Sequence, residues 1–299
     1  MNKEFKSGFI AIIGRPNVGK STLINNLVGR KIAIMSDKPQ TTRNEVIGIL
    51  TKKDEYQLIF VDTPGIHKPK NNLGEFMMST VKKSLRNADL IIYMVDSSKS
   101  FGRGEEYVIE ILKGLKTPVI LAINKIDLAP KEEVLPIIKL YEEQIDVANI
   151  IPISALKADN IEELKKKILD NIKPGPQYYP EEATSSVEEK DLVSEIIREK
   201  ILFLTKEEVP HSVAVSVELI EEEGNMVKVY ASIFVERKSQ KGILIGKQGS
   251  MLKKIGKMSR VELEKLWGMK VYLDLLIKVK ENWRKRDSDL KNFGFRQEK

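Results

Sequence analysis

The chain has 299 residues, which is enough for about two domains. With 41% hydrophobic and 31% charged residues, its composition is typical of globular proteins and excludes a largely disordered chain. The absence of cysteine excludes a disulfide scaffold, a thiol nucleophile and a thiolate zinc site, and two histidines argue against a multi-histidine metal site. No apolar run approaches the roughly 18 residues that a membrane-spanning helix needs, so we expect a cytoplasmic protein.

The net charge of +7 is concentrated at one end of the sequence. Residues 237–299 contain 18 Lys and Arg against 7 Asp and Glu, whereas residues 1–236 contain 32 basic and 36 acidic residues. A basic segment beside a slightly acidic body suggests a polyanionic partner, either nucleic acid or an anionic membrane. Charge alone is equally consistent with a lysine-rich surface that binds nothing.

Short apolar runs alternate with helix-length segments through the first 173 residues. The runs are apolar on both faces, as expected for parallel strands that helices cover, and span residues 9–13, 57–61, 90–95, 119–123 and 150–153. Helices are predicted for residues 20–29, 74–87, 104–115, 132–144 and 160–172. This alternation predicts an α/β domain of residues 1–173 with a doubly wound, mostly parallel sheet.

A second, smaller α+β domain is predicted after a linker. Two prolines and a glycine interrupt the pattern near residue 175, and residues 174–190 are predicted to form the linker. In residues 191–299, a helical segment precedes two strands with period-2 alternation, then a glycine-interrupted helical region and a last strand. The predicted order is α-β-β-α-α-β, a small sheet with one face covered by helices.

A phosphate-binding loop follows the first predicted strand. Residues 14–21 match the pattern G-x-x-x-x-G-K-[ST] between a strand and a helix, the context that the motif requires. Glycines let backbone amides turn toward a phosphate, and the helix N-terminus adds partial positive charge. We expect Lys20 to reach the β- and γ-phosphates and Ser21 to hold Mg²⁺. The loop consists of Gly14, Arg15, Pro16, Asn17, Val18, Gly19, Lys20 and Ser21.

Three further motifs follow predicted strands, at the edge where ligands collect in open α/β sheets. In the first, an aspartate can hold a metal through water and a glycine amide can meet a terminal phosphate. In the second, the final carboxylate can accept two hydrogen bonds from guanine while the lysine stem covers the base. In the third, a backbone amide can meet the guanine carbonyl. The motifs are Asp62, Thr63, Pro64 and Gly65; Asn124, Lys125, Ile126 and Asp127; and Ser154, Ala155 and Leu156.

Together these residues resemble the translation-factor-related GTPases, in the order typical of that family. The resemblance implies a P-loop NTPase fold, binding of GTP and GDP with Mg²⁺, and slow hydrolysis of GTP to GDP and phosphate. Two adjacent threonines, Thr41 and Thr42, compete to complete the metal shell, and alignment to the family favours Thr42. The expected metal ligands are Ser21, Thr42 and Asp62, and the expected catalytic residues are Lys20, Thr42, Gly65 and Asn17.

One departure bears on mechanism. Ile66 follows Gly65 where Ras-like enzymes carry a glutamine that orients the attacking water, and isoleucine cannot do this. In related enzymes with a hydrophobic residue at this position, an asparagine placed like Asn17 helps to bind K⁺. Arg15 and Arg43 are both candidates for an arginine that acts in cis, and the sequence does not separate them.

A GxxG sequence lies in the basic C-terminal domain. Such a loop between helices lets a nucleic-acid backbone approach closely, and several lysines surround it. The element order resembles the type II KH fold, which implies RNA binding; a basic module that binds no RNA is the alternative. Trp283 either extends this surface or ends a helix without contacting RNA. The expected RNA-binding residues are Lys241, Gly246, Lys247, Gln248, Gly249, Lys253, Lys254 and Lys257.

A P-loop GTPase domain followed by a KH domain resembles a family of bacterial ribosome-assembly GTPases over essentially the whole chain. The resemblance implies binding near the 3′ end of small-subunit ribosomal RNA, action on the small ribosomal subunit, and loose association with the inner face of the membrane. We expect a monomer. The main alternative is a passive RNA-binding adaptor whose nucleotide is structural.

Overall fold

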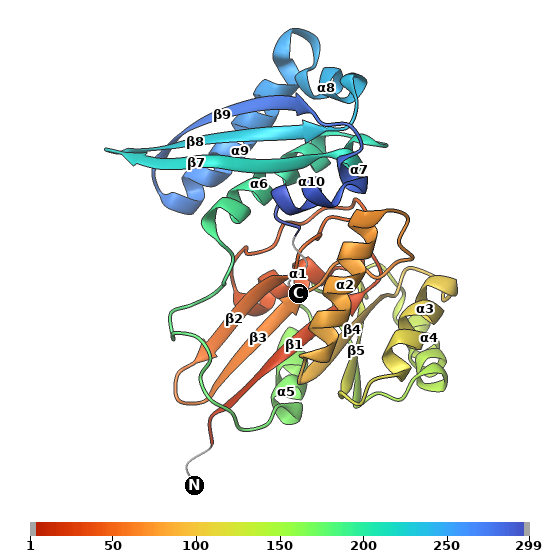
Figure 1. Ribbon diagram of the computed structural model, residues 1–299. Coiled ribbons are helices and arrows are strands. Elements are labelled where there is room, and N and C mark those ends of the chain that lie inside the picture. Colours follow the sequence, from red (N-terminus) through yellow and green to blue (C-terminus); the bar gives the residue numbers. More distant parts are fainter. Residues whose placement is uncertain (1–3, 296–299) are drawn as a thin grey trace. The chain divides into compact units, whose positions relative to one another are not determined.

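A six-stranded sheet forms the centre of the first of two units within residues 4–295, which the computed structural model describes (Figure 1). The strand order is β2-β3-β1-β4-β5-β6; β2 is antiparallel to β3, and the other neighbours are parallel. The strands are β1 (Lys6–Gly14), β2 (Val46–Lys52), β3 (Tyr56–Asp62), β4 (Leu90–Asp96), β5 (Val119–Asn124) and β6 (Asn149–Pro152). The doubly wound, mostly parallel fold predicted from the sequence is confirmed.

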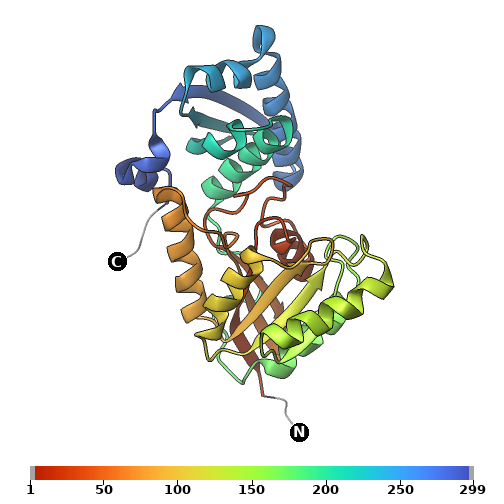
Figure 2. The ribbon, with the colours of Figure 1, turned by 90° about the vertical axis from the view of Figure 1, so that its right-hand side faces the viewer.

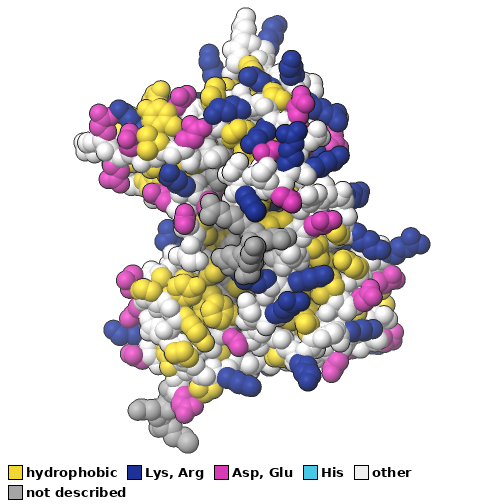
Figure 3. All heavy atoms as spheres, viewed as in Figure 1, with side chains coloured by type: hydrophobic (Ala, Val, Ile, Leu, Met, Phe, Trp, Pro, Cys, Tyr) yellow, Lys and Arg dark blue, Asp and Glu magenta, His cyan; other side chains and the backbone are white. Residues whose placement is uncertain are grey.

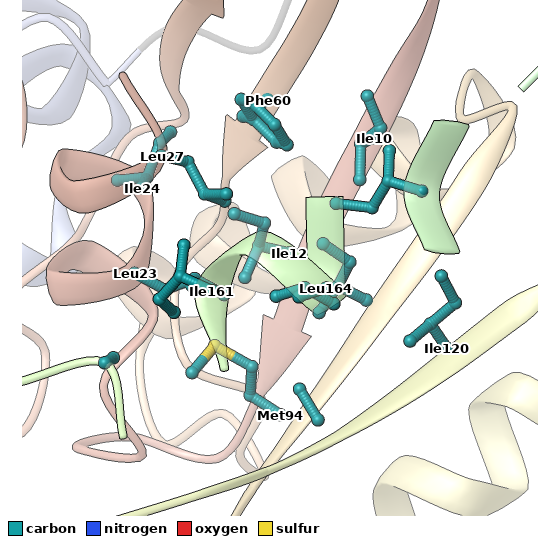
Figure 4. Packing of buried hydrophobic residues seen from close by; sticks show 14 of the residues in the cluster. Ile10, Ile12, Leu23, Ile24, Leu27, Phe60, Met94, Ile120, Ile161 and Leu164 are labelled. Atoms are coloured by element: carbon teal, nitrogen blue, oxygen red, sulfur yellow. The ribbon is translucent and has the colours of Figure 1, made fainter. Parts of the chain in front are cut away.

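Helices bury both faces of this sheet. One hydrophobic cluster joins the sheet to α1 (Lys20–Val28) and α5 (Ile161–Asn171), with Leu23, Phe60 and Leu164 among its fully buried members (Figure 4). The other joins it to α2 (Asn72–Arg86), α3 (Arg103–Lys113) and α4 (Lys131–Gln144). Figure 2 shows these helices flanking the strands. Burial on both sides explains why the strands read as continuous apolar runs.

The sequence prediction missed β2. This strand contains Gly48 and ends in polar residues, and it lies at the edge of the sheet, so its apolar pattern is weaker than that of the central strands. A Cβ on Gly48 would lie 2.5 Å from Cδ1 of Ile32 and 2.8 Å from Cγ2 of Val28, so side chains of α1 and of the loop after it pack closely against the strand at this point. The five strands that were predicted all form.

Most of the predicted linker is hydrogen-bonded to the first unit, which includes residues 77–186. The fully buried side chain of Gln57 accepts hydrogen bonds from the amides of Tyr178 and Tyr179 at 2.8 and 2.9 Å. The amide of Ile49 donates to the carbonyl of Thr184 at 2.9 Å, which covers the exposed edge of β2. The outer ends of the two predicted domains, residues 1–3 and 296–299, lie outside the described residues.

The second unit has the predicted α-β-β-α-α-β order. Its described part has a three-stranded sheet, β7-β8-β9, with β8 antiparallel to β7 and parallel to β9. One face packs on α6 and α9 in a separate hydrophobic core. The elements are α6 (Glu189–Leu204), α7 (Val209–Ser212), β7 (Ala214–Glu223), β8 (Met226–Val235), α8 (Lys238–Ile245), η1 (Lys247–Gly249), α9 (Ser250–Trp267), β9 (Lys270–Val279), η2 (Trp283–Lys285) and α10 (Asp287–Asn292). Residues 34–41 and 69–76 also belong to this unit.

Trp283 anchors the end of the second unit and does not extend its surface. The ring is 0% exposed, and its Nε1 donates a hydrogen bond to the carbonyl of Ser212 at 2.8 Å. It also packs edge-on against Phe293, with centroids 5.3 Å apart. The interpretation of Trp283 as part of an RNA surface is therefore wrong.

Among residues 4–295, every helix is too short or too polar to cross a membrane.

Replacing Trp283 with alanine should destabilise the second unit by about 3–5 kcal/mol, because it leaves a cavity and an unpaired buried carbonyl. Phe203, which is 72% exposed on α6, is the matched aromatic control, and Phe203→Ala should change stability by less than about 0.5 kcal/mol. Urea unfolding followed by circular dichroism measures both. Equal effects of the two substitutions would contradict the assigned burial of Trp283.

Candidate functional site

Two glycines shape the loop between β1 and α1. Gly14 and Gly19 have φ of 151° and 104°, which L side chains rarely adopt. A Cβ on Gly14 would lie 2.3 Å from the carbonyl oxygen of Met94, and one on Gly19 would lie 2.3 Å from Nδ2 of Asn124. The loop thus folds tightly against the ends of β4 and β5 and leads into the N-terminus of α1, where amide groups favour an anion.

Four side chains from three parts of the chain, the start of α1, the end of β3 and the loop before β2, meet beside this loop. The hydroxyl of Ser21 donates to Oδ2 of Asp62 at 2.7 Å and lies 3.0 Å from the hydroxyl of Thr42. Thr42 in turn donates to Asp62 at 3.3 Å. The ammonium of Lys20 donates to the carbonyl of Arg15 at 3.2 Å, within the loop. The structure therefore brings together the three predicted metal ligands and places Lys20 next to them.

The cluster holds buried charge of both signs. Lys20 is 6% exposed and Asp62 is 0% exposed. Burial lowers the pKa of Lys20, which the charge of Asp62 opposes. Burial also raises the pKa of Asp62, opposed first by the charge of Lys20 and then by hydrogen bonds from Ser21 and Thr42. Each charge thus lies where only a close counter-charge stabilises it.

The donor set fits Mg²⁺. Oδ1 of Asp62 is buried and has no hydrogen-bond partner among the described residues, and two hydroxyls lie next to the same carboxylate. Mg²⁺ prefers such hard oxygen ligands and is commonly shared between a protein and substrate phosphates. Ser21, Thr42 and Asp62 would hold it, and the bound ion would neutralise charge on the phosphates.

The loop after β3 is tied to the phosphate-binding loop. The amide of Ile66 donates to the carbonyl of Gly14 at 2.9 Å, and a Cβ on Gly65 would lie 2.7 Å from backbone atoms of Pro16. The hydroxyl of Thr63 donates to the carbonyl of Ile12 at 2.8 Å. Ile66 is buried in the core shared with α2, so its side chain is unavailable to orient a water molecule.

Asn124, at the end of β5, joins the phosphate-binding loop to the loops after β5 and β6. Its Nδ2 donates to the carbonyl of Val18 at 2.7 Å, and its Oδ1 accepts the amide of Ala155 at 2.8 Å. Asp127 is exposed and accepts a hydrogen bond from the hydroxyl of Ser154 at 2.6 Å. Asn124 therefore links the phosphate-binding loop to the loop that carries Asp127, which is the edge that would receive guanine.

Lys125 is fixed by a residue that the sequence interpretation missed. Its ammonium pairs with Oδ2 of Asp96 at 2.7 Å, which restrains the end of the side chain. Asp96 ends β4 directly after a run of apolar residues, and this position was the available signal. The amide of Ile126, in the same motif as Lys125, donates a hydrogen bond to the carbonyl of Ile153 at 3.3 Å. Leu156, the last residue of the third predicted motif, has an exposed side chain.

The two candidate cis arginines differ in surroundings. Arg15 pairs with Glu105 of α3 at 3.6 Å, and its guanidinium lies over Gly104, where a Cβ would come 2.6 Å from Nε. Arg43 is buried. Glu105 was not predicted as a site residue, although it precedes Val108 and Ile109 by helical spacing and so falls on the buried face of α3.

The GxxG loop of the second unit connects α8 to α9. Gly246 has φ of 70°, and a Cβ there would lie 2.8 Å from the amide nitrogen of Met251, so the turn requires glycine. Gln248 and Gly249 also have positive φ. Figure 3 shows Lys and Arg side chains gathered over α8 and the adjoining end of the sheet. The exposed members of the predicted set are Lys247, Gln248, Lys253, Lys254 and Lys257, and Lys241 is half-buried.

The first unit has the loop of a P-loop GTPase, with the predicted metal ligands and base-recognition residues placed around it, and the second has the topology and glycine turn of a type II KH domain. Family models agree: a 50S ribosome-binding GTPase model matches residues 9–125, and a KH domain model matches residues 208–284. A crystal structure of Era in complex with MgGDPNP and nucleotides 1506–1542 of 16S ribosomal RNA is 42% identical. It covers 98% of this chain and 100% of its own, with a TM-score of 0.95.

A second solved structure agrees with this match. It is a single-residue variant of Aquifex aeolicus Era bound to GDP·AlF4⁻, 43% identical over 98% of this chain and 100% of its own, with a TM-score of 0.94. The chain therefore belongs to the Era family and is a GTPase that uses GTP, GDP and Mg²⁺. The roles of individual residues stay predictions, which the following substitutions test.

Asp62→Asn should abolish the response of the protein to Mg²⁺ and remove the dependence of stability on pH that Asp62 causes. The folded protein holds the Asp62 proton more tightly than the unfolded chain, so wild-type stability falls as the pH rises from about 4 through the raised pKa. An asparagine does not titrate, so this fall should be absent from the variant, although its Lys20 ammonium then lacks the counter-charge of residue 62. Thermal unfolding across pH, with and without a GTP analogue and Mg²⁺, measures this. The same fall in Tm with pH in nucleotide-free Asp62→Asn would contradict the electrostatic account.

Asp127→Asn should weaken GDP binding by at least about 100-fold, because the amide cannot accept both guanine donors. Xanthosine diphosphate carries an acceptor at the same edge, so it should bind the variant better than GDP. Asp146→Asn is the control, since Asp146 is an exposed aspartate in the loop after α4. Fluorescent-nucleotide titration measures all three proteins, and a variant with unchanged guanine preference rules out the role of Asp127.

Proposed function

We propose that this protein is a GTP-hydrolysing switch that binds small-subunit ribosomal RNA near its 3′ end and acts in assembly of the small ribosomal subunit. The observation that carries the proposal is the presence of both machineries in one chain: the buried Lys20–Asp62 cluster and the lysine-flanked GxxG turn. A relative that is 42% identical over 98% of the chain is described in complex with a GTP analogue and the segment 1506–1542 of 16S ribosomal RNA, which supports the same RNA class here.

Hydrolysis would rest on positioning and charge stabilisation. Lys20 and the amides at the start of α1 would bind the β- and γ-phosphates, and the Gly65 amide would contact the terminal phosphate. Thr42 would join the metal shell only with the triphosphate, so the loops carrying Thr42 and Gly65 would order with GTP and relax with GDP. Because isoleucine at position 66 has no group that can orient the attacking water, we infer slow intrinsic turnover.

RNA binding would use the backbone of the glycine turn and the lysines around it. The exposed lysines would meet phosphates, which gives affinity without sequence preference. Unstacked bases would lie along the groove beside the turn, where Ile243 is exposed on α8, and would provide specificity. Nucleotide state and RNA affinity would then be coupled reciprocally.

A passive RNA-binding adaptor is the alternative, and multiple-turnover phosphate release separates the two. The proposed switch releases phosphate above the level of a Lys20→Ala control and binds RNA with different affinity in its GDP, GTP-analogue and nucleotide-free forms. Equal RNA affinity in all three forms would contradict the switch.

Lys247→Ala should weaken RNA binding and reduce the slope of log affinity against log salt by about 1, because one phosphate contact is lost. Lys265→Ala is the matched control: Lys265 is an exposed lysine near the opposite end of α9 from the glycine turn. Filter binding with a 3′-terminal small-subunit RNA fragment across a salt series measures both. If both substitutions have equal effects, the glycine turn is not the RNA site.

Asn17 has φ of 67° in the phosphate-binding loop and is exposed there, which places it where a monovalent cation could join the phosphates. We expect hydrolysis to be faster in K⁺ than in Na⁺, and Asn17→Ala to remove the difference. Phosphate release at equal ionic strength measures it, and equal rates of the wild-type protein in both salts would exclude a K⁺ site.

Peripheral membrane association and a monomeric state complete the proposal. The basic face of the second unit has the charge that anionic lipid attracts. Flotation with anionic liposomes tests membrane binding: association that competing RNA abolishes would indicate that lipid and RNA share one surface. Light scattering tests the monomer.

A further inference from the structure

Residues 34–41 have no helix or strand in the structure, and side chains hold them in place within the second unit. The amide of Met35 donates to Oε1 of Glu199 at 2.9 Å. At the other end of the segment, the guanidinium of Arg198 donates to the carbonyls of Gln40 and Thr41. Neighbouring residues of α6 thus bind both ends of one irregular segment.

The side chain of Arg198 is buried between α6 and residues 40 and 41. It is 2% exposed, and its charge cannot be removed by deprotonation, so its donors need acceptors inside the protein. Nε donates to Oε1 of Glu195 at 2.8 Å, and Nη2 also bonds the same carboxylate. Glu195, one turn earlier on α6, therefore orients the guanidinium, whose remaining donors face the carbonyls of residues 40 and 41.

The carbonyl of Thr41 and the amide of Thr42 belong to one rigid peptide group. A hydrogen bond that fixes this carbonyl therefore also restrains the Cα of Thr42. The hydroxyl of Thr42 lies 3.0 Å from Ser21 and 3.3 Å from Asp62, among the expected metal ligands. Gln40 has φ of 62°, a conformation that residues other than glycine rarely adopt, so the turn before Thr42 relies on such external contacts.

We propose that Arg198 is a positioning residue for GTP hydrolysis: it orients the peptide between Thr41 and Thr42 so that the Thr42 hydroxyl meets Mg²⁺ when a triphosphate is bound. The inference rests on the proposed role of Thr42.

The test is Arg198→Lys, which keeps the charge but presents one ammonium in place of a planar fork and cannot serve Glu195 and two carbonyls together. We expect the hydrolysis rate at saturating GTP to fall about 10- to 100-fold, and the Mg²⁺-dependent gain in affinity for a GTP analogue to fall similarly. GDP affinity should stay within about twofold, because in its proposed role Thr42 joins the metal shell only when a triphosphate is bound. Arg260→Lys is the matched control: Arg260 is exposed on α9, 3.9 Å from Glu264.

A purely structural role would instead lower Tm and weaken nucleotide-free RNA binding, and GDP and GTP-analogue affinities would fall alike; that result overturns the inference. If Arg198→Lys does not fold, Glu195→Gln provides the second test, since it leaves Arg198 in place without its orienting carboxylate. This variant should show the same selective loss for the GTP analogue, and unchanged selectivity would overturn the inference.

The variant Thr42→Ala distinguishes failure of the positioning role of Arg198 from failure of the proposed role of Thr42. If Thr42→Ala loses the Mg²⁺-dependent gain while Arg198→Lys and Glu195→Gln keep it, the positioning role is wrong and the proposed role of Thr42 stands. If Thr42→Ala itself keeps the gain, the proposed role of Thr42 fails and the inference fails with it.

Discussion

The buried opposite charges of Lys20 and Asp62 are the constraint on which the nucleotide site depends. Both side chains are almost completely removed from water, and burial shifts each pKa toward the neutral form. Hydrogen bonds from Ser21 and Thr42 offset only part of the cost at Asp62. A phosphate beside the ammonium and a divalent cation beside the carboxylate would each supply a further counter-charge, so a single ligand, a nucleotide with Mg²⁺, would stabilise the whole cluster.

The parallel sheet explains how distant parts of the sequence reach this cluster. β1, β3 and β5 end at one edge of the sheet, and they deliver the phosphate-binding loop, Asp62 and Asn124 respectively. The second unit also relies on a glycine turn that opens a helix, at Gly246 to Gly249 before α9. In both units, the tight backbone turn would let a phosphate group approach the backbone closely, and nearby lysines would supply positive charge.

The sequence predicted best those features that depend on residues close together in the chain, such as the hydrophobic period of a strand or the spacing of glycines in a loop. The buried strands, the phosphate-binding loop and the α-β-β-α-α-β order follow from hydrophobic period and glycine spacing, and all were predicted. What escaped prediction depends on tertiary partners. β2 is an edge strand whose pairing with β3 is not visible in its own residues, and Trp283 is buried because Ser212, far away in the sequence, accepts its Nε1. Arg198 was interpretable only once its carbonyl partners at residues 40 and 41 were known.

The most direct measurement is an equilibrium titration of the wild-type protein with a non-hydrolysable GTP analogue and with its adenine counterpart, each with and without Mg²⁺. If the buried charges and the Asp127 edge together receive one nucleotide, the guanine analogue binds most tightly with Mg²⁺, binds more weakly without it, and the adenine analogue binds far more weakly in both conditions. Comparable affinity for the two bases, or indifference to Mg²⁺, would contradict the account.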